Sequence, residues 1–191
     1  MLTDLEVPRL LDAPLLLRAF ADADAALVAE AGTDPLIPLI TTVPTGPAAI
    51  AAVQAFIERQ RDRAKSGQGY SFVIADAGTD LGMGQIGVWP HHQGRASVGY
   101  WVAASARRRG IAHHALQMVS TWALTLPDVH RLELYVEPWN EGSWRAAERA
   151  GFAREGLLRS WQPVGGQRCD MYMYSRLRTD PAPEHKTADG R

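Results

Sequence analysis

A strand, a long helix and a second strand follow one another between residues 94 and 137, and this order constrains the fold most. The segments GRASVGYWVA (94–103) and HRLELYVE (130–137) alternate in polarity as strands do. Between them, residues 110–126 carry an apolar stripe at helical spacing. The stripe consists of Ile111, Ala115, Met118, Val119 and Trp122. A strand that returns through a helix lies parallel to the first strand, so we expect one parallel pair.

The remaining hydrophobic patterns predict further strands and helices around this pair. Strands are predicted at 14–20, 70–76, 82–90, 152–164 and 167–178. Helices are predicted at 21–32, 48–66 and 140–151. The proline-rich segment 33–47 is expected to be a loop. The predicted fold is therefore α+β (mixed α/β), with a mixed, mostly antiparallel sheet of about seven strands flanked by about four helices.

Chain length and the two ends set the expected domain organisation. With 191 residues, 46% of them hydrophobic, the chain can build one substantial core, so residues 1–178 are expected to form a single domain. Residues 179–191 contain no apolar anchor and are expected to be a disordered tail. The N-terminus lacks the pattern of a secretory leader, and no apolar run approaches the roughly 18 residues that cross a bilayer.

Charge and cysteine content narrow the class of function. A formal net charge of -1 argues against binding nucleic acid or a membrane through the overall field. The single cysteine, Cys169, excludes an internal disulfide and lies in an expected strand, where it is a small hydrophobe rather than a nucleophile. We therefore expect a cytoplasmic protein without nucleic-acid or membrane partners.

Three consecutive arginines, Arg107, Arg108 and Arg109, stand just before the helix at 110–126. Cations are unfavourable at the N-terminal end of a helix, which carries unpaired N–H groups and a partial positive charge. A phosphate or pyrophosphate held by the backbone N–H groups of residues 107–112 would account for them. The alternative is a solvated cluster, because arginine is the usual cation of this chain: only two of its 20 basic residues are lysines.

The residues after the triplet complete a longer motif. RRRGIA (107–112) matches the pattern of Gln or Arg, two variable residues, Gly, one variable residue, then Gly or Ala. The similarity continues through GYWV before the loop and through RLELYVEPWNEGS and ERAGFAREGLLR after the helix. Over roughly residues 13–177 the chain resembles the GCN5-related N-acetyltransferase (GNAT) family, and its spacing resembles the RimJ/RimL subgroup. Sequence motifs for nucleoside-triphosphate hydrolysis and for dinucleotide binding are both missing.

The resemblance implies the GNAT fold and an acetyl-CoA-dependent N-acetyltransferase. In this family the loop holds the coenzyme A pyrophosphate, and the pantetheine arm lies beside the preceding strand, where a backbone N–H near Val102 would polarise the acetyl carbonyl. The implied pyrophosphate loop consists of Arg107, Arg108, Arg109, Gly110, Ile111 and Ala112. The implied lining of the pantetheine arm consists of Trp101, Val102 and Ala103. The co-substrate is expected to be acetyl-CoA, with no metal.

Asn140 and Ser143 open the expected helix at 140–151 one turn apart. By resemblance, Asn140 contacts the coenzyme, and Ser143 contacts it at the thiol and donates the proton to the departing thiolate. The alternative is that Asn140 is an ordinary N-cap and Ser143 a polar residue of the first turn. Many relatives outside the subgroup have a tyrosine as general acid where this chain has Ala147. Ser143 is therefore the candidate proton donor.

Candidate general bases lie on the strand expected at 130–137. Glu133 and Glu137 share one face of this strand, with Tyr135 between them, although solvated strand carboxylates are the alternative for both. Gln162 stands where some ribosomal-type relatives have a glutamate. An α-amine with a pKa of about 7.7–8.0 needs less help to lose its proton than a lysine, so a low-pKa amine is favoured as the acceptor.

The acceptor side and the histidine pairs are less informative. Residues 91–92 and 113–114 are both His-His, but adjacent side chains diverge on a helix and no other ligand stands at metal spacing. His91 and His92, the loop at 35–47 and the hairpin around Gly165 are the expected walls of the acceptor pocket.

Two other functions stay open at this point. One is a coenzyme A-binding regulator or catalytically silent module, favoured by Ala147 and Gln162. The other is an RNA-binding protein that uses the arginines, which the near-neutral charge disfavours. The amine acceptor could be a peptide N-terminus or a small molecule, and the chain could be a monomer or a homodimer.

Overall fold

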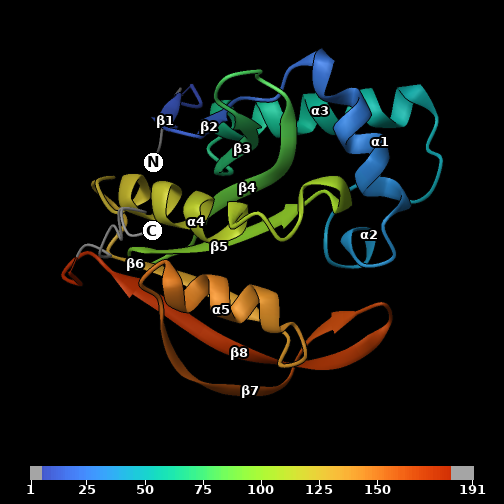
Figure 1. The fold of residues 1–191 in the computed structure, drawn as a ribbon. Helices are drawn as coiled ribbons and strands as arrows, with labels where there is room; N and C mark the ends of the chain where they lie inside the picture. The colour runs from blue at the N-terminus through green and yellow to red at the C-terminus, as the bar shows by residue number, and fades with distance from the viewer. Residues whose placement is uncertain (1–5, 182–191) are drawn as a thin grey trace, which may run out of the picture.

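The computed structural model describes residues 6–181, which form one eight-stranded sheet with the order β1-β2-β3-β4-β5-β6-β8-β7 (Figure 1). The strands are β1 Leu10–Asp12, β2 Leu15–Arg18, β3 Tyr70–Asp76, β4 Gly82–Pro90, β5 Arg95–Val102, β6 Arg131–Val136, β7 Ala153–Val164 and β8 Gln167–Leu177. The helices are α1 Ala25–Thr33, α2 Ile37–Ile40, α3 Ile50–Lys65, α4 Ile111–Ala123 and α5 Glu141–Arg149. Two short 3-10 turns, Asp22–Asp24 and Ala104–Ala106, precede α1 and α4.

The predicted fold class and the parallel pair are confirmed. β5 and β6 pair in parallel through the connection that contains α4, and every other neighbouring pair of strands is antiparallel. The sheet has one strand more than expected, because residues 10–12 form the short β1 against β2.

The prediction of a continuous loop at 33–47 was wrong over the single turn α2. Asp34 accepts hydrogen bonds from the backbone N–H groups of Leu36 (2.9 Å) and Ile37 (3.1 Å), which satisfies the free donors of this turn. Pro38, in the first turn, removes no internal hydrogen bond there. The prolines indicated a loop, although a helix of a single turn can contain a proline in its first turn.

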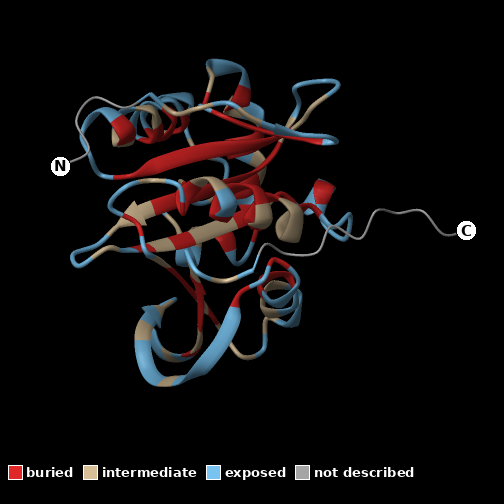
Figure 2. Cartoon of the chain, turned by 90° about the vertical axis from the view of Figure 1, so that its left-hand side faces the viewer, coloured by how far each residue is buried: buried red, intermediate tan, exposed pale blue. Residues whose placement is uncertain are grey.

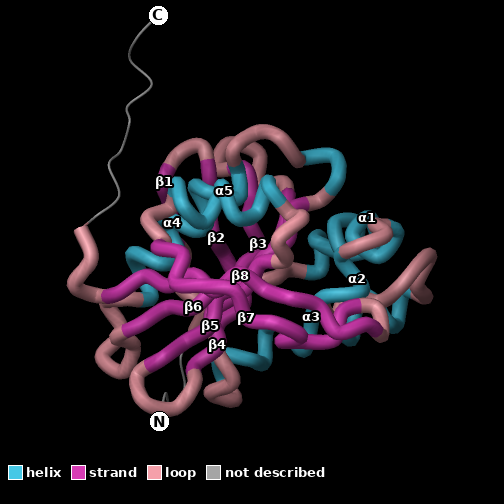
Figure 3. The backbone as a smooth tube through the Cα atoms, turned by 90° about the horizontal axis from the view of Figure 1, so that it is seen from below, coloured by secondary structure: helices cyan, strands magenta, loops and turns pink. Residues whose placement is uncertain are grey.

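Two apolar clusters lie on opposite faces of the sheet. Figures 1 and 3 show α4 and α5 on one side of the strands and α1 to α3 on the other. On β5, Ala96 and Val98 belong to the cluster under α4, whereas Trp101 belongs to the cluster under α3. The central strands are buried (Figure 2), so alternate residues of β5 face different cores.

The backbones of β4 and β5 approach each other closely at Gly84, which pairs with Val102. A Cβ atom at Gly84 would lie 2.3 Å from the carbonyl oxygen of Trp101. Glycine is therefore required at this point, and the approach fixes the backbone of the last residues of β5.

The termini are described only in part. Asp180 accepts a hydrogen bond from the backbone N–H of Leu177 (2.8 Å). Residues 182–191, most of the tail expected to be disordered, lie outside the described residues, as do residues 1–5. Within residues 6–181, no helix combines the length and the apolar character needed to cross a membrane.

Replacing Gly84 with alanine should lower the free energy of unfolding by about 2 kcal/mol, because the new methyl group meets backbone atoms that cannot move independently. The measurement is urea denaturation followed by circular dichroism. Gly156→Ala in β7 is the matched control, since a Cβ atom there meets nothing within 4 Å, and its stability should stay near that of the parent. Equal effects of the two substitutions would contradict the close approach.

Candidate active site

The parallel strands β5 and β6 separate partway along their length. They pair only at Arg95–Arg131, Ala96–Leu132 and Ser97–Glu133. Beyond this point β6 continues to pair with β8, and β5 continues to pair with β4. A cavity of about 880 Å³ opens where they separate. It is lined from the two strands by Val98, Gly99, Tyr100, Trp101, Val102, Leu134, Tyr135 and Val136. The unpaired edge of β5 can accept an extended ligand as an added strand.

The loop before α4 borders this cavity and leaves the first N–H groups of the helix without a side-chain cap. Gly110 is the N-cap residue and has a φ of 74°, the left-handed conformation that glycine adopts most readily. The first turn of α4 contains no acidic residue. Gly110, Ile111 and Ala112 all line the cavity. These free N–H groups and the helix dipole favour an anion at this end of the cavity.

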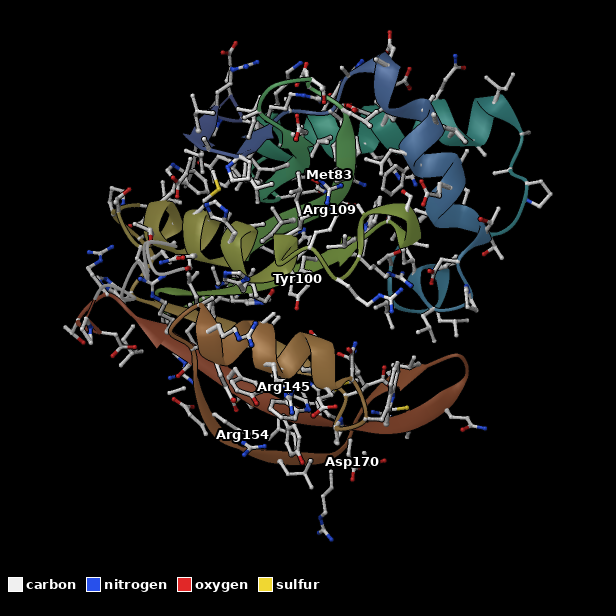
Figure 4. All side chains as sticks on the ribbon, in the orientation of Figure 1. Met83, Tyr100, Arg109, Arg145, Arg154 and Asp170 are labelled. Atoms are coloured by element: carbon white, nitrogen blue, oxygen red, sulfur yellow. The ribbon has the colours of Figure 1, made fainter. Side chains whose placement is uncertain are left out.

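The three arginines have different surroundings. Arg107 pairs with Asp34 (2.5 Å) and donates to the carbonyl oxygen of Val102 (3.0 Å), so it ties the end of β5 to the turn before α2. Arg108 is exposed and lines the cavity. Arg109 instead contacts the sulfur of Met83, as Figure 4 shows, and does not line the cavity. Arg107 lines the cavity as well, but its guanidinium is already paired with Asp34, so Arg108 is the cation of the triplet best placed for a bound anion.

The sequence reasoning missed two further cations that line the cavity. Arg145 and Arg149 of α5 both line it, four residues apart on one side of the helix. Arg145 forms an ion pair with Glu141 (2.6 Å), and Figure 4 shows its position on α5. The four-residue spacing could have indicated a shared face, although nothing in the sequence showed that this face meets the loop.

Asp34 is buried beside the Arg107 guanidinium. Burial alone would raise the pKa of its carboxyl group, but the backbone N–H groups of Leu36 and Ile37 and the Arg107 side chain together lower it. Asp34 therefore stays charged. It caps α2 and also holds the Arg107 side chain in place.

Asn140 is the N-cap of α5, as predicted, because its Oδ1 atom accepts from the backbone N–H of Ser143 (3.2 Å). The hydroxyl groups of Ser143 and Tyr100 are 2.8 Å apart and form a hydrogen bond. Burial raises the pKa of Tyr100 to about 12, although the bond to Ser143 opposes this shift. All three residues line the cavity, and Figure 4 shows Tyr100 on the side of β5 toward α5. Ala147 is fully buried.

Tyr100 is therefore a polar residue of the cavity that the sequence reasoning did not single out. The signal available was strand alternation, since residues 98, 100 and 102 share a face. That signal could not show that the face meets Ser143, because the two residues are 43 positions apart.

The two candidate bases are in different environments. Glu133 is only 2% exposed and does not line the cavity. It accepts hydrogen bonds from Arg131 (2.9 Å) and Tyr135 (2.8 Å), and Arg95 lies 3.6 Å away. Burial would raise its pKa, but these three partners lower it. A carboxylate held in this way is a poor proton acceptor, whereas Glu137 lines the cavity.

The expected acceptor walls are brought to the cavity in part. Residues 36, 37 and 40–42, around α2, line it, and so do Gln162 and Met171 of the final hairpin. His91 and His92 do not; His91 contacts Ser97 instead (2.9 Å). Among residues 6–181, no three His, Cys, Asp or Glu side chains are grouped so that they could hold a metal ion.

A splayed parallel pair beside a helix N-terminus without a side-chain cap is suited to an extended ligand with an anionic end. Residues 14–153 match the model of the acetyltransferase (GNAT) domain, so the chain belongs to the GNAT family of acetyltransferases. It is an acetyl-CoA-dependent acyltransferase, as the sequence resemblance implied.

Individual relatives agree with this assignment. The N-acetyltransferase p20 of Bacillus licheniformis is 28% identical over 170 residues, which cover 88% of this chain and 95% of that protein. Mycobacterium smegmatis RimJ, solved with a CoA disulfide, has a TM-score of 0.73 at 27% identity and covers 90% of this chain and 86% of its own. A GNAT acetyltransferase of Bacillus anthracis has the same fold, with a TM-score of 0.77 at 20% identity, covering 91% of this chain and all of its own. The resemblance to the RimJ/RimL subgroup is confirmed.

Arg108→Gln and Arg107→Gln should have separate effects. Loss of Arg108 should raise the Kd for coenzyme A about three- to tenfold, because a cation at the anion site is removed, and leave Tm unchanged. Loss of Arg107 should lower the free energy of unfolding by about 1 kcal/mol, a modest value because the guanidinium is partly exposed. Calorimetric titration and thermal denaturation measure the two effects; an unstable Arg108→Gln variant with normal affinity would contradict these roles.

The effect of Arg107→Gln should also depend on pH. Because the folded-state pKa of Asp34 is lowered, the ion pair stabilises fully above the unfolded carboxyl pKa of about 3.9. This stabilisation is lost as the pH falls through the folded-state pKa. The stability difference between parent and variant should therefore narrow below about pH 3.9, and a difference that widens there would contradict the pairing.

Proposed function

We propose that this GNAT acetyltransferase transfers the acetyl group to a primary amine by direct attack of the amine, without a covalent enzyme intermediate. The acceptor is a protein N-terminal α-amine or a small-molecule amine. The observation that carries the proposal is the continuous cavity from the uncapped α4 loop, along the free edge of β5, to the Tyr100–Ser143 hydroxyl pair.

The residues present fit acetyl-CoA. The backbone N–H groups at Gly110, Ile111 and Ala112, with Arg108 and Arg149 nearby, would hold the pyrophosphate. The free edge of β5 from Val98 to Val102 would hold the pantetheine arm, with Trp101, Val102 and Ala103 as its expected neighbours and an N–H near Val102 directed at the acetyl carbonyl. When bound, the co-substrate supplies the thioester whose acetyl group is transferred.

Protonation of the departing thiolate is assigned to Ser143. Ser143 of α5 lines the cavity, and its Oγ atom is hydrogen-bonded to the Tyr100 hydroxyl. With a pKa of about 12, Tyr100 keeps its proton at neutral pH and can return one to Ser143 as Ser143 gives its own away. The pair supplies the hydroxyl function that Ala147 lacks.

Deprotonation of the incoming ammonium is assigned to Glu137. It is the acidic side chain among the described cavity-lining residues, and Gln162 nearby cannot accept a proton. Glu133 is less suited to act as the base, because Arg131, Arg95 and Tyr135 contact its carboxylate. A single weak base suits an amine with a pKa near neutrality. This favours an α-amine, whose pKa is about 7.7–8.0.

A catalytically silent coenzyme A-binding module is the second candidate. Ala147 and Gln162 favour it, since each replaces a catalytic side chain used by some relatives. The hydroxyl pair of Tyr100 and Ser143 argues for turnover, because a module that only binds has no need of two aligned hydroxyl groups inside the cavity.

Ser143→Ala should lower kcat about 10²-fold, because the proton donor is lost, while the Kd for coenzyme A stays within a few-fold. Tyr100→Phe should lower kcat by a smaller factor, since Ser143 remains but loses its partner. Thiol release measures kcat and calorimetry measures Kd. Unchanged turnover in Ser143→Ala would remove this residue from the mechanism.

The pH profile of kcat/KM distinguishes the two glutamates. Glu137→Gln should lower kcat/KM and leave an inflection set by the acceptor amine alone. Glu133→Gln should lower Tm, because Arg131 loses a buried charged partner, and should leave the shape of the profile unchanged. A profile altered by Glu133→Gln and untouched by Glu137→Gln would reverse the assignment.

A further inference from the structure

The cavity has a second polar region on the face of the sheet that carries α3. Gln60 and Arg63 of α3 and Gln85 of β4 line it there, and Gln85 pairs in register with Trp101 of β5. This face is opposite to the one on which Tyr100 meets Ser143, so the region lies away from the hydroxyl pair assigned to the departing thiolate.

Hydrogen bonding fixes the orientation of the Gln60 amide. Its Oε1 atom accepts from Arg63 Nε (3.0 Å) and from Gln85 Nε2 (3.1 Å). Gln85 in turn donates to Ser71 (2.8 Å) and accepts from Trp101 Nε1 (2.8 Å). Rotating the Gln60 amide by half a turn would place its NH₂ group against two donors. The amide is therefore held with its oxygen toward Arg63 and Gln85.

One donor in this network has no partner. Gln60 is 1% exposed, and its Nε2 atom makes no hydrogen bond within residues 6–181. A buried donor without an acceptor destabilises the fold, so native structures rarely leave one unless a ligand or water completes it. The cavity-lining side chain of Gln60 is thus set up to donate to an acceptor that enters from the cavity.

Arg63 carries an uncompensated charge beside this donor. It is partly buried and forms no ion pair among the described residues. Burial, and the positive charge of Arg59, lower its pKa, which means that its charged form is held at a cost. An anion next to Arg63 would offset that cost and could also accept from Gln60.

The opposite side of the cavity carries the complementary charge. Glu137, just after β6, is the acidic residue among the described lining residues, and aromatic side chains such as Trp89 and Tyr135 lie on the same face. The Trp89 ring packs against Gly99, where a Cβ atom would lie 3.0 Å from the ring. An acceptor molecule that fits between Arg63 and Glu137 carries a cationic amine close to an anionic group.

We propose that Arg63 and the free N–H of Gln60 form a carboxylate subsite, so that the preferred acceptor carries a carboxylate close to its reacting amine. A free amino acid has this chemistry, and so does a peptide that begins with an acidic residue. The inference rests on the proposed function, because it assumes that the amine reacts near Glu137 and Ser143.

The test compares matched acceptors that differ only in the carboxylate. Phenylalanine is paired with phenylalaninamide, and Asp-Ala-Ala-amide is paired with Asn-Ala-Ala-amide. For each pair, the ratio of kcat/KM is measured by thiol release in the parent, Arg63→Met and Arg63→Lys. Comparing ratios between variants cancels the different pKa values of the amines. Lys65→Met is the control, since Lys65 is exposed on the same helix and does not line the cavity.

Arg63→Met should lower the ratio by about tenfold or more for at least one pair, the loss expected for a charge-assisted hydrogen bond. Arg63→Lys should recover part of the ratio, and Lys65→Met should leave it unchanged. A response of the phenylalanine pair identifies a free amino acid as the source of the carboxylate, and a response of the peptide pair identifies an acidic N-terminus. Unchanged ratios for both pairs in Arg63→Met would overturn the subsite.

A binding measurement separates failure of the subsite from failure of the proposed function. Calorimetry with coenzyme A present compares N-acetylphenylalanine and N-acetyl-Asp-Ala-Ala-amide with their uncharged amide counterparts, and it requires no turnover. Preference for the carboxylate that disappears in Arg63→Met, without turnover of any amine, supports the subsite and overturns the acetyl transfer. Turnover of amines, with no carboxylate preference in rate or binding, overturns the subsite and leaves the acetyl transfer standing.

Discussion

The buried carboxylate of Glu133 joins the two parallel strands at the last residue pair before they separate. Arg131 of β6 donates to it, and Arg95 of β5 lies 3.6 Å away. Ser97, the β5 partner of Glu133 in the register, is the last residue of β5 to pair with β6. Because Glu133 is buried, removing either arginine would leave its carboxylate with less compensating charge and lower the stability of the fold. The cavity can open abruptly because this interaction keeps the strands together up to that point.

Beyond the junction, β5 keeps its position without β6. Gly84 lets the backbone of β4 approach closely, and Arg107 bonds to the carbonyl oxygen of Val102 while paired with Asp34. These contacts hold a free strand edge rigid, so an extended ligand could add to it without first ordering the protein. Arg107 therefore has a structural role in addition to its predicted place in the pyrophosphate loop, because it lines the cavity and also holds the end of β5.

Local patterns predicted the fold and the loop of the site, whereas long-range contacts decided the roles of individual side chains. Hydrophobic periodicity along residues 94–137 identified the parallel crossover, because the strand and helix periods can be read from the local sequence alone. The same reasoning gave Glu133 and Glu137 equally as candidate bases, since alternation shows that they share a face but not that Arg95 meets Glu133 from another strand. Tyr100 was missed for the same reason, because Ser143 reaches it from 43 residues away. The turn α2 was missed because its cap, Asp34, was not distinguished from the surrounding loop residues.

Alternation along β5 also separates the two halves of the proposed reaction. Tyr100 extends toward α5 and the hydroxyl of Ser143, and Trp101, the next residue, extends toward α3 and the amide of Gln85. A shift of one residue in the register would exchange these side chains between the faces. The Gly84–Val102 and Gln85–Trp101 pairs set this register. They therefore determine which side chains of β5 face the acetyl donor. An acceptor bound over Trp101 and a donor bound along the edge of β5 would meet beyond Ser97, where β5 no longer pairs with β6. The two molecules can meet there because no backbone of β6 occupies the space beside β5.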